Sequence, residues 1–395
     1  MPALLVALTV GCSAGDRAAS DAYRGVPVAR PSPLEVEAAP RWKSGIVFST
    51  AAHDSLRLWP FAAAAFAPDG SLIVGAGPEP LSIAPDGRTV RRLGREGEGP
   101  GEYRVVFRIV PAADSTFLIA DLNGRLTRIR PDGSVHGIIP RLEDAGSGRE
   151  SEPVALLSPD RIVATWWQQR PNRGTLAGLP GGVFERDPVP LPVFDTMGRA
   201  MEPLGQWRGL ERAVITLGGG LARLPPPFAR SVVHAGRGDA IAIGPTDSID
   251  VTLFSEGRVI LRLLVTGEAA QPSRELEAAW RLGVVEELGD AGAAAIRALA
   301  DVPRVRELPR VGAPVMDDER NVWVGGYVPP KGTVRQWTVY SPAGKPIGRM
   351  DLPAAAEAFV PGRAEILDLH RGRIALLRES GAGERFVEVR GVIRP

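Results

Sequence analysis

A short strand-and-turn pattern recurs six times between residue 43 and the C-terminus. In each copy an apolar run meets a turn rich in Asp and Gly, and further β-branched runs and turns follow. The strands that follow the first turn centre on Leu72, Phe117, Ile162, Ile241, Val322 and Ile374, at spacings of 45, 45, 79, 81 and 52 residues. A period near 45 with about four strands is typical of β-propeller blades. The sequence therefore predicts an all-β fold, a six-bladed β-propeller over residues 43–395.

Two of the spacings are long and require insertions. Residues 273–300 are predicted as a helical insertion, because Ser273 can cap a helix and Trp280 lies on an apolar face with helical spacing. The other insertion, around residues 170–227, contains glycine and proline runs and is predicted to be a loop. A seventh or eighth blade would have to be a degenerate one inside a long interval.

The composition fits this fold and excludes some partners. The chain has 46 glycines and 37 prolines. Residues that interrupt helices are too frequent here for a helical bundle, and they suit short strands joined by turns. Lys and Arg together number 47 against 46 Asp and Glu, so there is no basic excess of the kind that marks a nucleic-acid-binding protein. No nucleic-acid partner is expected.

The N-terminus contains the sole cysteine. The apolar run Ala3–Val10 is far shorter than the roughly 20 residues that span a bilayer, but it matches the core of a secretory signal. Leu8–Cys12 resembles the bacterial lipobox, which implies that residues 1–12 are a leader and that Cys12 is lipidated. Ser13 after the cysteine implies the outer membrane, with the protein facing the periplasm or the exterior.

Two other interpretations of these residues remain. Gly11–Gly15 also matches the G-x-S-x-G nucleophile elbow, but that motif needs a buried strand before it and a helix after it, and neither is predicted here. The terminus could also be a frayed apolar end with an incidental cysteine. With one cysteine, an intramolecular disulfide and a four-cysteine zinc site are excluded.

Residues 13–42 are rich in Ala, Ser, Pro and Arg and show no helix or strand period, which predicts a flexible tether. A ring of blades must also close, since an open edge strand invites aggregation. A strand within residues 45–60, such as Gly45–Phe48, is predicted to complete the last blade.

The run Leu93–Tyr103 has the pattern G-x-x-G-x-G-P-G-E-[FY]. With the repeats, it resembles the bacterial six-bladed β-propeller lipoproteins, relatives of the NHL- and TolB-like propellers, over roughly residues 45–395. The resemblance implies a fold and a cell-envelope location rather than a reaction.

The same run has two interpretations in terms of its residues. Its glycines and Pro100 constrain the backbone, and Arg95, Glu98 and Glu102 place charges beside Tyr103. It is either a rigid connector whose charges pair with neighbouring blades, or a contact for a ligand or partner. A dinucleotide site is not predicted, because Glu102 replaces the last glycine of G-x-G-x-x-G.

The strand before each first turn is predicted to be innermost. These strands are Ala62–Phe66, Arg108–Val110, Val154–Leu157, Arg230–His234, Ala313–Met316 and Glu365–Leu369. Their conspicuous polar groups are Arg108, Arg230, His234, Glu365 and Asp368, which suggest ion pairing across a channel more than a metal cage. His234 with Asp368 and His370 is the constellation to test first.

The predicted function is a lipid-anchored binding module for an unidentified protein or small ligand, without a cofactor or metal. Propeller rims and channel mouths suit recognition because loops from every blade converge there. Trp166 and Trp167 could offer one stacking surface, although packing between blades accounts for both. The rival is a propeller hydrolase or lactonase with a divalent metal at the channel mouth, so whether the protein is an enzyme stays open.

Overall fold

The computed structural model describes a chain built mostly from strands. It describes residues 25–52, 58, 63–122, 124–144, 149–158, 160–166, 184–217, 220–267, 270–300, 302, 307–330, 332–354, 365–380 and 383–395. The leader, Cys12, Trp167 and residues 13–24 of the expected tether lie outside these residues, as does the side chain of Trp166. No described helix is both long enough and apolar enough to cross a bilayer.

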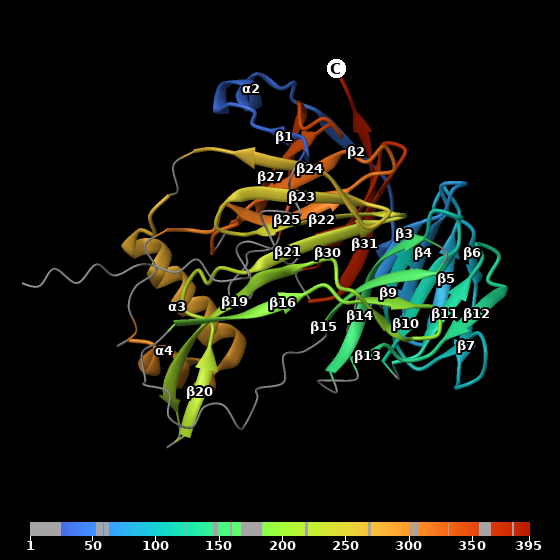
Figure 1. Cartoon of the computed structure of the whole chain (residues 1–395), viewed down its shortest axis with the longest axis horizontal. Helices are drawn as coiled ribbons and strands as arrows, with labels where there is room; N and C mark the ends of the chain where they lie inside the picture. Colours follow the sequence, from blue (N-terminus) through green and yellow to red (C-terminus); the bar gives the residue numbers. More distant parts are fainter. Residues whose placement is uncertain are drawn as a thin grey trace, which may run out of the picture.

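Six sheets of four or five strands follow one another along the chain, and they are numbered here in that order (Figure 1). Sheet 1 consists of β3 (Ala63–Phe66), β4 (Leu72–Ala76), β5 (Glu79–Ile83) and β6 (Val90–Arg92). Sheet 2 consists of β9 (Val106–Pro111), β10 (Phe117–Asp121), β11 (Leu126–Ile129) and β12 (Val135–Ile139). Sheet 3 consists of β13 (Glu143–Asp144), β14 (Arg149–Ser158), β15 (Arg161–Trp166), β17 (Val193–Asp195) and β18 (Ala200–Met201).

Sheets 4 to 6 include strands from both ends of the described chain. Sheet 4 consists of β21 (Val232–Arg237), β22 (Ala240–Pro245), β23 (Ile249–Ser255), β24 (Arg258–Val265) and β1 (Val28–Ala29). Sheet 5 consists of β25 (Val311–Met316), β26 (Val322–Gly326), β27 (Val334–Tyr340) and β28 (Pro346–Pro353). Sheet 6 consists of β29 (Ile366–His370), β30 (Arg373–Glu379), β31 (Arg385–Ile393) and β2 (Lys43–Ser49).

In each sheet one strand precedes the first turn rich in Asp or Gly, and we call these six strands, among them β14 of sheet 3, the first strands. They contact one another in order. β3 contacts β9, β9 contacts β14, and the series continues through β21, β25 and β29 back to β3. These six strands overlap the six predicted to be innermost. The arrangement is propeller-like, because each sheet meets the next at its first strand.

Apolar cores fill the space between consecutive sheets. Because strand side chains alternate, neighbouring residues serve different cores. Val322 and Val324 pack against sheet 4, whereas Trp323 between them packs against sheet 6. One core joins each consecutive pair of sheets, and the core of Phe66, Leu72 and Val389 joins sheet 6 to sheet 1. No sheet buries both of its faces alone, so the sheets depend on each other for stability.

The predicted closing strand is present. β2 pairs antiparallel with β31, with Lys43 opposite Ile393. The short 3-10 turn η1 (Thr50–Ala52) follows, and the hydroxyl of Thr50 accepts a hydrogen bond of 2.9 Å from the backbone N–H of Val387. The last sheet therefore takes its outer strand from the N-terminal part of the chain.

Residues 26–49 form a belt along the outer strands of three sheets, and we call this segment the N-terminal belt. It pairs with sheet 4 through β1, which runs parallel to β24. It then forms α2 (Pro33–Ala38) and is bound to sheet 5, where the N–H of Trp42 donates to the carbonyl of Arg349 at 2.7 Å. It ends as β2 of sheet 6.

The prediction of a flexible tether is therefore wrong for residues 26–42. A capping box between Ser32 and Glu35 starts α2, and Ala39 and Trp42 are buried against the sheets. Elements of two and six residues are too short to show a period, so the sequence pattern did not reveal them.

The two long intervals meet in one added module. The interval predicted as a loop contains a three-stranded sheet of β16 (Phe184–Pro190), β19 (Gln206–Leu217) and β20 (Gly220–Leu224). The helical insertion is two helices, α3 (Arg274–Leu288) and α4 (Asp290–Ala298), divided at Gly289, and Ser273 caps α3 as predicted. Trp280 and Val284 share a core with Ile215, so helices and sheet pack together beside the ring (Figure 1).

Candidate functional site

A cavity of about 260 Å³ lies where the turns after the first strands come together. We call it the mouth pocket. Among the described residues, five of the six sheets contribute to its wall, namely all except sheet 3. Representative lining residues are Phe66 of sheet 1, Ser115 of sheet 2, Arg237 and Asp239 of sheet 4, Asp318 of sheet 5 and His370 of sheet 6.

The aspartates that recur in these turns hold the turns themselves. Asp69 Oδ1 accepts hydrogen bonds from the N–H and hydroxyl of Ser71, at 2.9 and 2.7 Å. Asp114 accepts the equivalent bonds from Thr116. The hydroxyl of Ser71 keeps the pKa of Asp69 below its usual value. These repeated carboxylates are thus structural, and they fix the positions of the residues that line the pocket.

One polar cluster spans sheets 4, 5 and 6 at the mouth. Arg237 pairs with Asp368, whose other oxygen accepts the N–H of Phe66 at 2.7 Å. His370 Nδ1 lies 3.1 Å from Asp318 Oδ2 and 3.3 Å from an Arg237 nitrogen, and its ring stacks on Phe66. Burial lowers the pKa of His370, and the charge of Asp318 opposes this shift only in part.

The predicted constellation is present only in part. Asp368 and His370 lie together, but their cationic neighbour is Arg237 rather than His234. His234 lies three residues earlier on β21, which is about 10 Å along a strand and on the opposite face. Arg237 and Asp318 were not predicted, although both adjoin Asp/Gly turns at the ends of inner strands, which was a usable signal.

His234 and Arg108 belong to a second group among the first strands. Arg108 of β9 forms an ion pair with Glu152 of β14. Burial and the nearby charge of Arg108 lower the pKa of His234 to about 4. The imidazole is therefore neutral in the folded protein at pH values where a free histidine is already protonated.

This shift predicts a pH dependence of stability. Between about pH 6.5 and pH 4 the unfolded chain binds a proton at His234 and the folded chain does not. The free energy of unfolding should therefore fall as the pH drops through this window. His234→Asn should show a smaller fall, measured by urea unfolding at pH 7 and pH 4.5. His136→Asn, at an exposed histidine, is the control, and equal falls in all three proteins would contradict the assignment.

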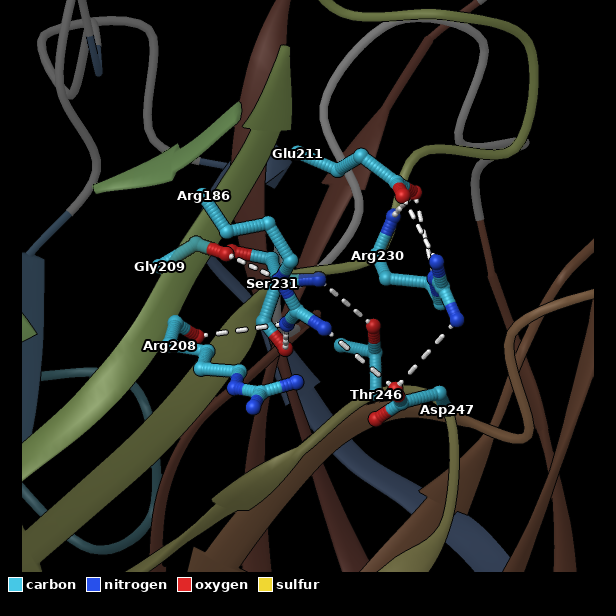
Figure 2. A network of polar contacts seen from close by, with 8 residues as sticks. All are labelled: Arg186, Arg208, Gly209, Glu211, Arg230, Ser231, Thr246 and Asp247. Carbon is cyan, nitrogen blue, oxygen red and sulfur yellow. Dashed lines mark hydrogen bonds and ion pairs between the residues drawn. The ribbon is translucent and has the colours of Figure 1, made fainter. Parts of the chain in front are cut away.

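Arg230 does not lie on a first strand, because β21 begins at Val232. Figure 2 shows it in a network between the added sheet and sheet 4. Arg230 Nη2 lies 2.7 Å from an oxygen of the buried Glu211, and Asp247 lies 3.8 Å from Arg230 and 3.3 Å from Arg186. The hydrogen bonds that Arg230 donates to Glu211 raise the pKa of Arg230. Its described contacts therefore link the added three-stranded sheet to sheet 4.

The glycine-rich run is held by contacts within itself. Arg95 Nε and Nη2 contact one oxygen of Glu102 at 2.8 and 2.6 Å, and β7 (Arg95–Glu96) pairs in parallel with β8 (Glu102–Tyr103). Arg104 pairs with Glu98. Tyr103 is fully buried, which raises its pKa to about 12.

The run is closely packed, as a rigid connector would be, but its charges pair within the run and with Arg104 rather than with neighbouring blades as that interpretation expected. A Cβ on Gly94 would lie 2.5 Å from the Tyr103 ring, so the close packing depends on glycine there. None of the run's residues lines the mouth pocket.

The mouth carboxylates do not fit a divalent-metal site. Asp239, Asp318 and Asp368 pair with Arg320, His370 and Arg237 respectively. Asp317, which also lines the pocket, accepts hydrogen bonds from Asn321 and Trp323. Across the described part of the chain, no three His, Cys, Asp or Glu side chains are grouped so as to hold a metal ion. The donor set thus differs from the convergent oxygens that calcium needs.

Comparisons with known proteins add likenesses but no family. No family model matches the chain. A glutamate 5-kinase of Rhizobium rhizogenes (strain K84 / ATCC BAA-868) is 28% identical over 207 residues, covering 47% of this chain and 50% of the kinase. This chain thus spans half the length of that relative, and the activity in the name belongs to the relative.

Three solved structures resemble most of the chain at low identity. A member of the duf4221 family from Bacteroides vulgatus has a TM-score of 0.47 and 9% identity, covering 90% of this chain and 98% of its own. A "Putative exported protein" from Bacteroides fragilis has 0.48 and 9%, covering 93% and 100%. A gluconolactonase from Xanthomonas campestris has 0.35 and 13%, covering 90% and 98%. At these scores the likenesses decide neither fold nor function.

Proposed function

We propose that the six sheets are the blades of a six-bladed β-propeller that binds a partner or ligand at the mouth pocket and is held at the cell envelope by a lipid on Cys12. The closed series of apolar cores, from sheet 1 through sheet 6 and back, supports the ring. The lipobox-like Leu8–Cys12 supports the anchor.

Convergence of five sheets on one cavity is the observation that carries the binding role. Loops on a rigid scaffold are the usual place for recognition. The pocket offers guanidinium groups at Arg237 and Arg320 and carboxylates at Asp239 and Asp318, beside the phenyl ring of Phe66. This mixture suits a polar group that both donates and accepts hydrogen bonds, such as a polar side chain at the tip of a partner's loop.

The histidine chemistry favours binding over hydrolysis. A general base must present a ring nitrogen within hydrogen-bond reach of the substrate. His370 Nδ1 is engaged by Asp318 and Arg237, and its Nε2 is buried. Together with the paired carboxylates, this gives the rival hydrolase little support among the described residues.

Site-specific photocrosslinking in membranes tests the proposal. A benzoyl-phenylalanine in place of Ala113, an exposed residue of the pocket wall, should give one discrete adduct after irradiation. The same probe in place of Arg88, an exposed residue in another turn, should not. Arg320→Gln, which alters the mouth charge at an exposed position, should weaken the Ala113 adduct. No adduct, or the same adduct from both positions, would contradict binding at the mouth.

Cys12→Ser in the same preparation separates the anchor from the binding role. Loss of the lipid should release the protein from the membrane fraction, because no described helix could hold it there. A Cys12→Ser protein that still sediments with membranes would refute the anchor and leave the mouth pocket to be judged on the crosslinks alone.

A further inference from the structure

A second cavity, of about 450 Å³, lies at the outer edge of sheets 5 and 6. We call it the rim groove. Its volume is within the range of roughly 300–1,000 Å³ that is usual for small-ligand sites. One wall is the end of the N-terminal belt, and the others are β27, β28 and β31. The charged side chains that line it are Arg41, Lys43, Arg349, Asp351 and Arg390.

The walls of the groove are rigid. Trp42 of the belt is buried, lies edge-on to Trp323 with ring centroids 5.7 Å apart, and has the guanidinium of Arg394 over its ring at 4.9 Å. A Cβ on Gly348 would lie 2.2 Å from the indole, so the ring rests directly on the backbone of β28. Trp337 and Met350 are almost completely buried. A ligand in this groove would meet a preformed surface.

The cationic side chains that line the groove outnumber the carboxylates that pair with them. Arg390 is neutralised by Glu388 at 2.5 Å, and Arg41 lies 3.5 Å from Asp351. Arg349 instead donates to the backbone carbonyls of Ala39, at 3.2 Å, and of Glu37.

Carbonyls are dipoles without net charge, so the guanidinium of Arg349 has no carboxylate partner among the described residues. Lys43 is exposed and forms no ion pair within the described part of the chain. Two positive charges, on Arg349 and Lys43, are therefore left over.

We infer that the rim groove binds a phosphate ester. A phosphate monoester carries a charge of about −1.5 to −2 at pH 7, which matches the two uncompensated cations. Arginine supplies paired N–H donors to phosphate oxygens, and lysine supplies a mobile point charge. Ser44, Gln336 and Thr338 also line the groove and offer further hydrogen-bond donors. This site is distinct from the mouth pocket and does not depend on the proposed function.

Binding in the groove would strengthen the attachment of the N-terminal belt to sheet 5. Lys43 belongs to the N-terminal belt, whereas Arg349 belongs to β28. An anion held between them ties the start of the described chain to its C-terminal part. A ligand that binds only the folded state raises its stability, so the bound phosphate should raise the melting temperature.

Titration with glycerol 3-phosphate tests the inference, with glycerol as the uncharged control and sodium chloride holding the ionic strength constant. Calorimetry should show saturable binding, and the melting temperature should rise. Lys43→Gln should weaken the affinity about tenfold, since a charge-assisted bond is lost. Lys345→Gln, which removes an equally exposed lysine outside the groove, should bind like the wild type.

A parallel arm uses vesicles of phosphatidylcholine with and without phosphatidate, which carries the same phosphate monoester on a lipid. Binding to phosphatidate vesicles alone would identify a lipid headgroup as the source, and binding to glycerol 3-phosphate would identify a free ester. Two results would overturn the inference. One is no saturable binding of either probe, and the other is an equal loss in the Lys43→Gln and Lys345→Gln variants.

Discussion

Replacing Trp42 with alanine is expected to lower the free energy of unfolding by about 3–5 kcal/mol, the usual range for a buried tryptophan. The indole anchors the N-terminal belt, because it is buried between β28 and Trp323 under the guanidinium of Arg394. Its loss leaves a cavity and frees the strand that completes sheet 6. Urea unfolding, followed by near-ultraviolet circular dichroism, measures the change.

A pair of glycine variants tests the same contact from the other side. Gly348→Ala places a Cβ 2.2 Å from the indole and should also destabilise the protein strongly. Gly45→Ala, in β2 itself, meets nothing within 4 Å and should change stability little. If Gly348→Ala is no worse than Gly45→Ala, or if Trp42→Ala unfolds like the wild type, the belt does not depend on this contact.

The second large effect is expected at a buried ion pair between sheets 5 and 6. Arg335 is almost inaccessible to water, and its Nε and Nη2 lie 2.8 and 3.0 Å from the two oxygens of Glu365. Arg335→Met should cost about 3–5 kcal/mol, because Glu365 is left as a buried charge without its partner. Urea unfolding at pH 7 measures the loss.

A double variant separates the ion pair from the packing. Arg335→Met with Glu365→Leu removes both charges, so much of the lost stability should return. Arg92→Met, in an exposed pair with Glu79 at 3.2 Å, should change stability by less than about 1 kcal/mol. If the double variant is no more stable than Arg335→Met alone, the cost comes from lost packing rather than from an unpaired carboxylate.

The ring of first strands could be predicted because each sheet repeats the same local pattern. A continuous apolar run, such as Val322–Val324, is consistent with a strand buried on both faces, and the Asp and Gly turns mark its ends. The long interval around residues 170–227 lacked that repetition. Its strands β19 and β20 pack against α3 and α4, while β16 pairs with β19, and nothing local in either segment reveals that partnership.

Only those residues of the candidate site that stand out in the local sequence could be predicted. Asp368 and His370 stood out as polar residues on an otherwise apolar inner strand. Arg237 and Asp318 join them only because the folded chain brings sheets 4 and 5 beside sheet 6. Arg230 lies just before β21 rather than on it. It is held there by an ion pair with Glu211 of β19, a strand within the interval that was predicted to be a loop.

The N-terminal belt also sets an order of events during synthesis. Val28 pairs with Arg262, and Lys43 pairs with Ile393 near the very end of the chain. The first described strands therefore emerge from the ribosome long before their partners exist. Contacts between residues so far apart in sequence form slowly, because a long loop must be closed first. Completion of sheet 6 is accordingly expected to be a late folding step, because β2 has to wait until β31 has been synthesised.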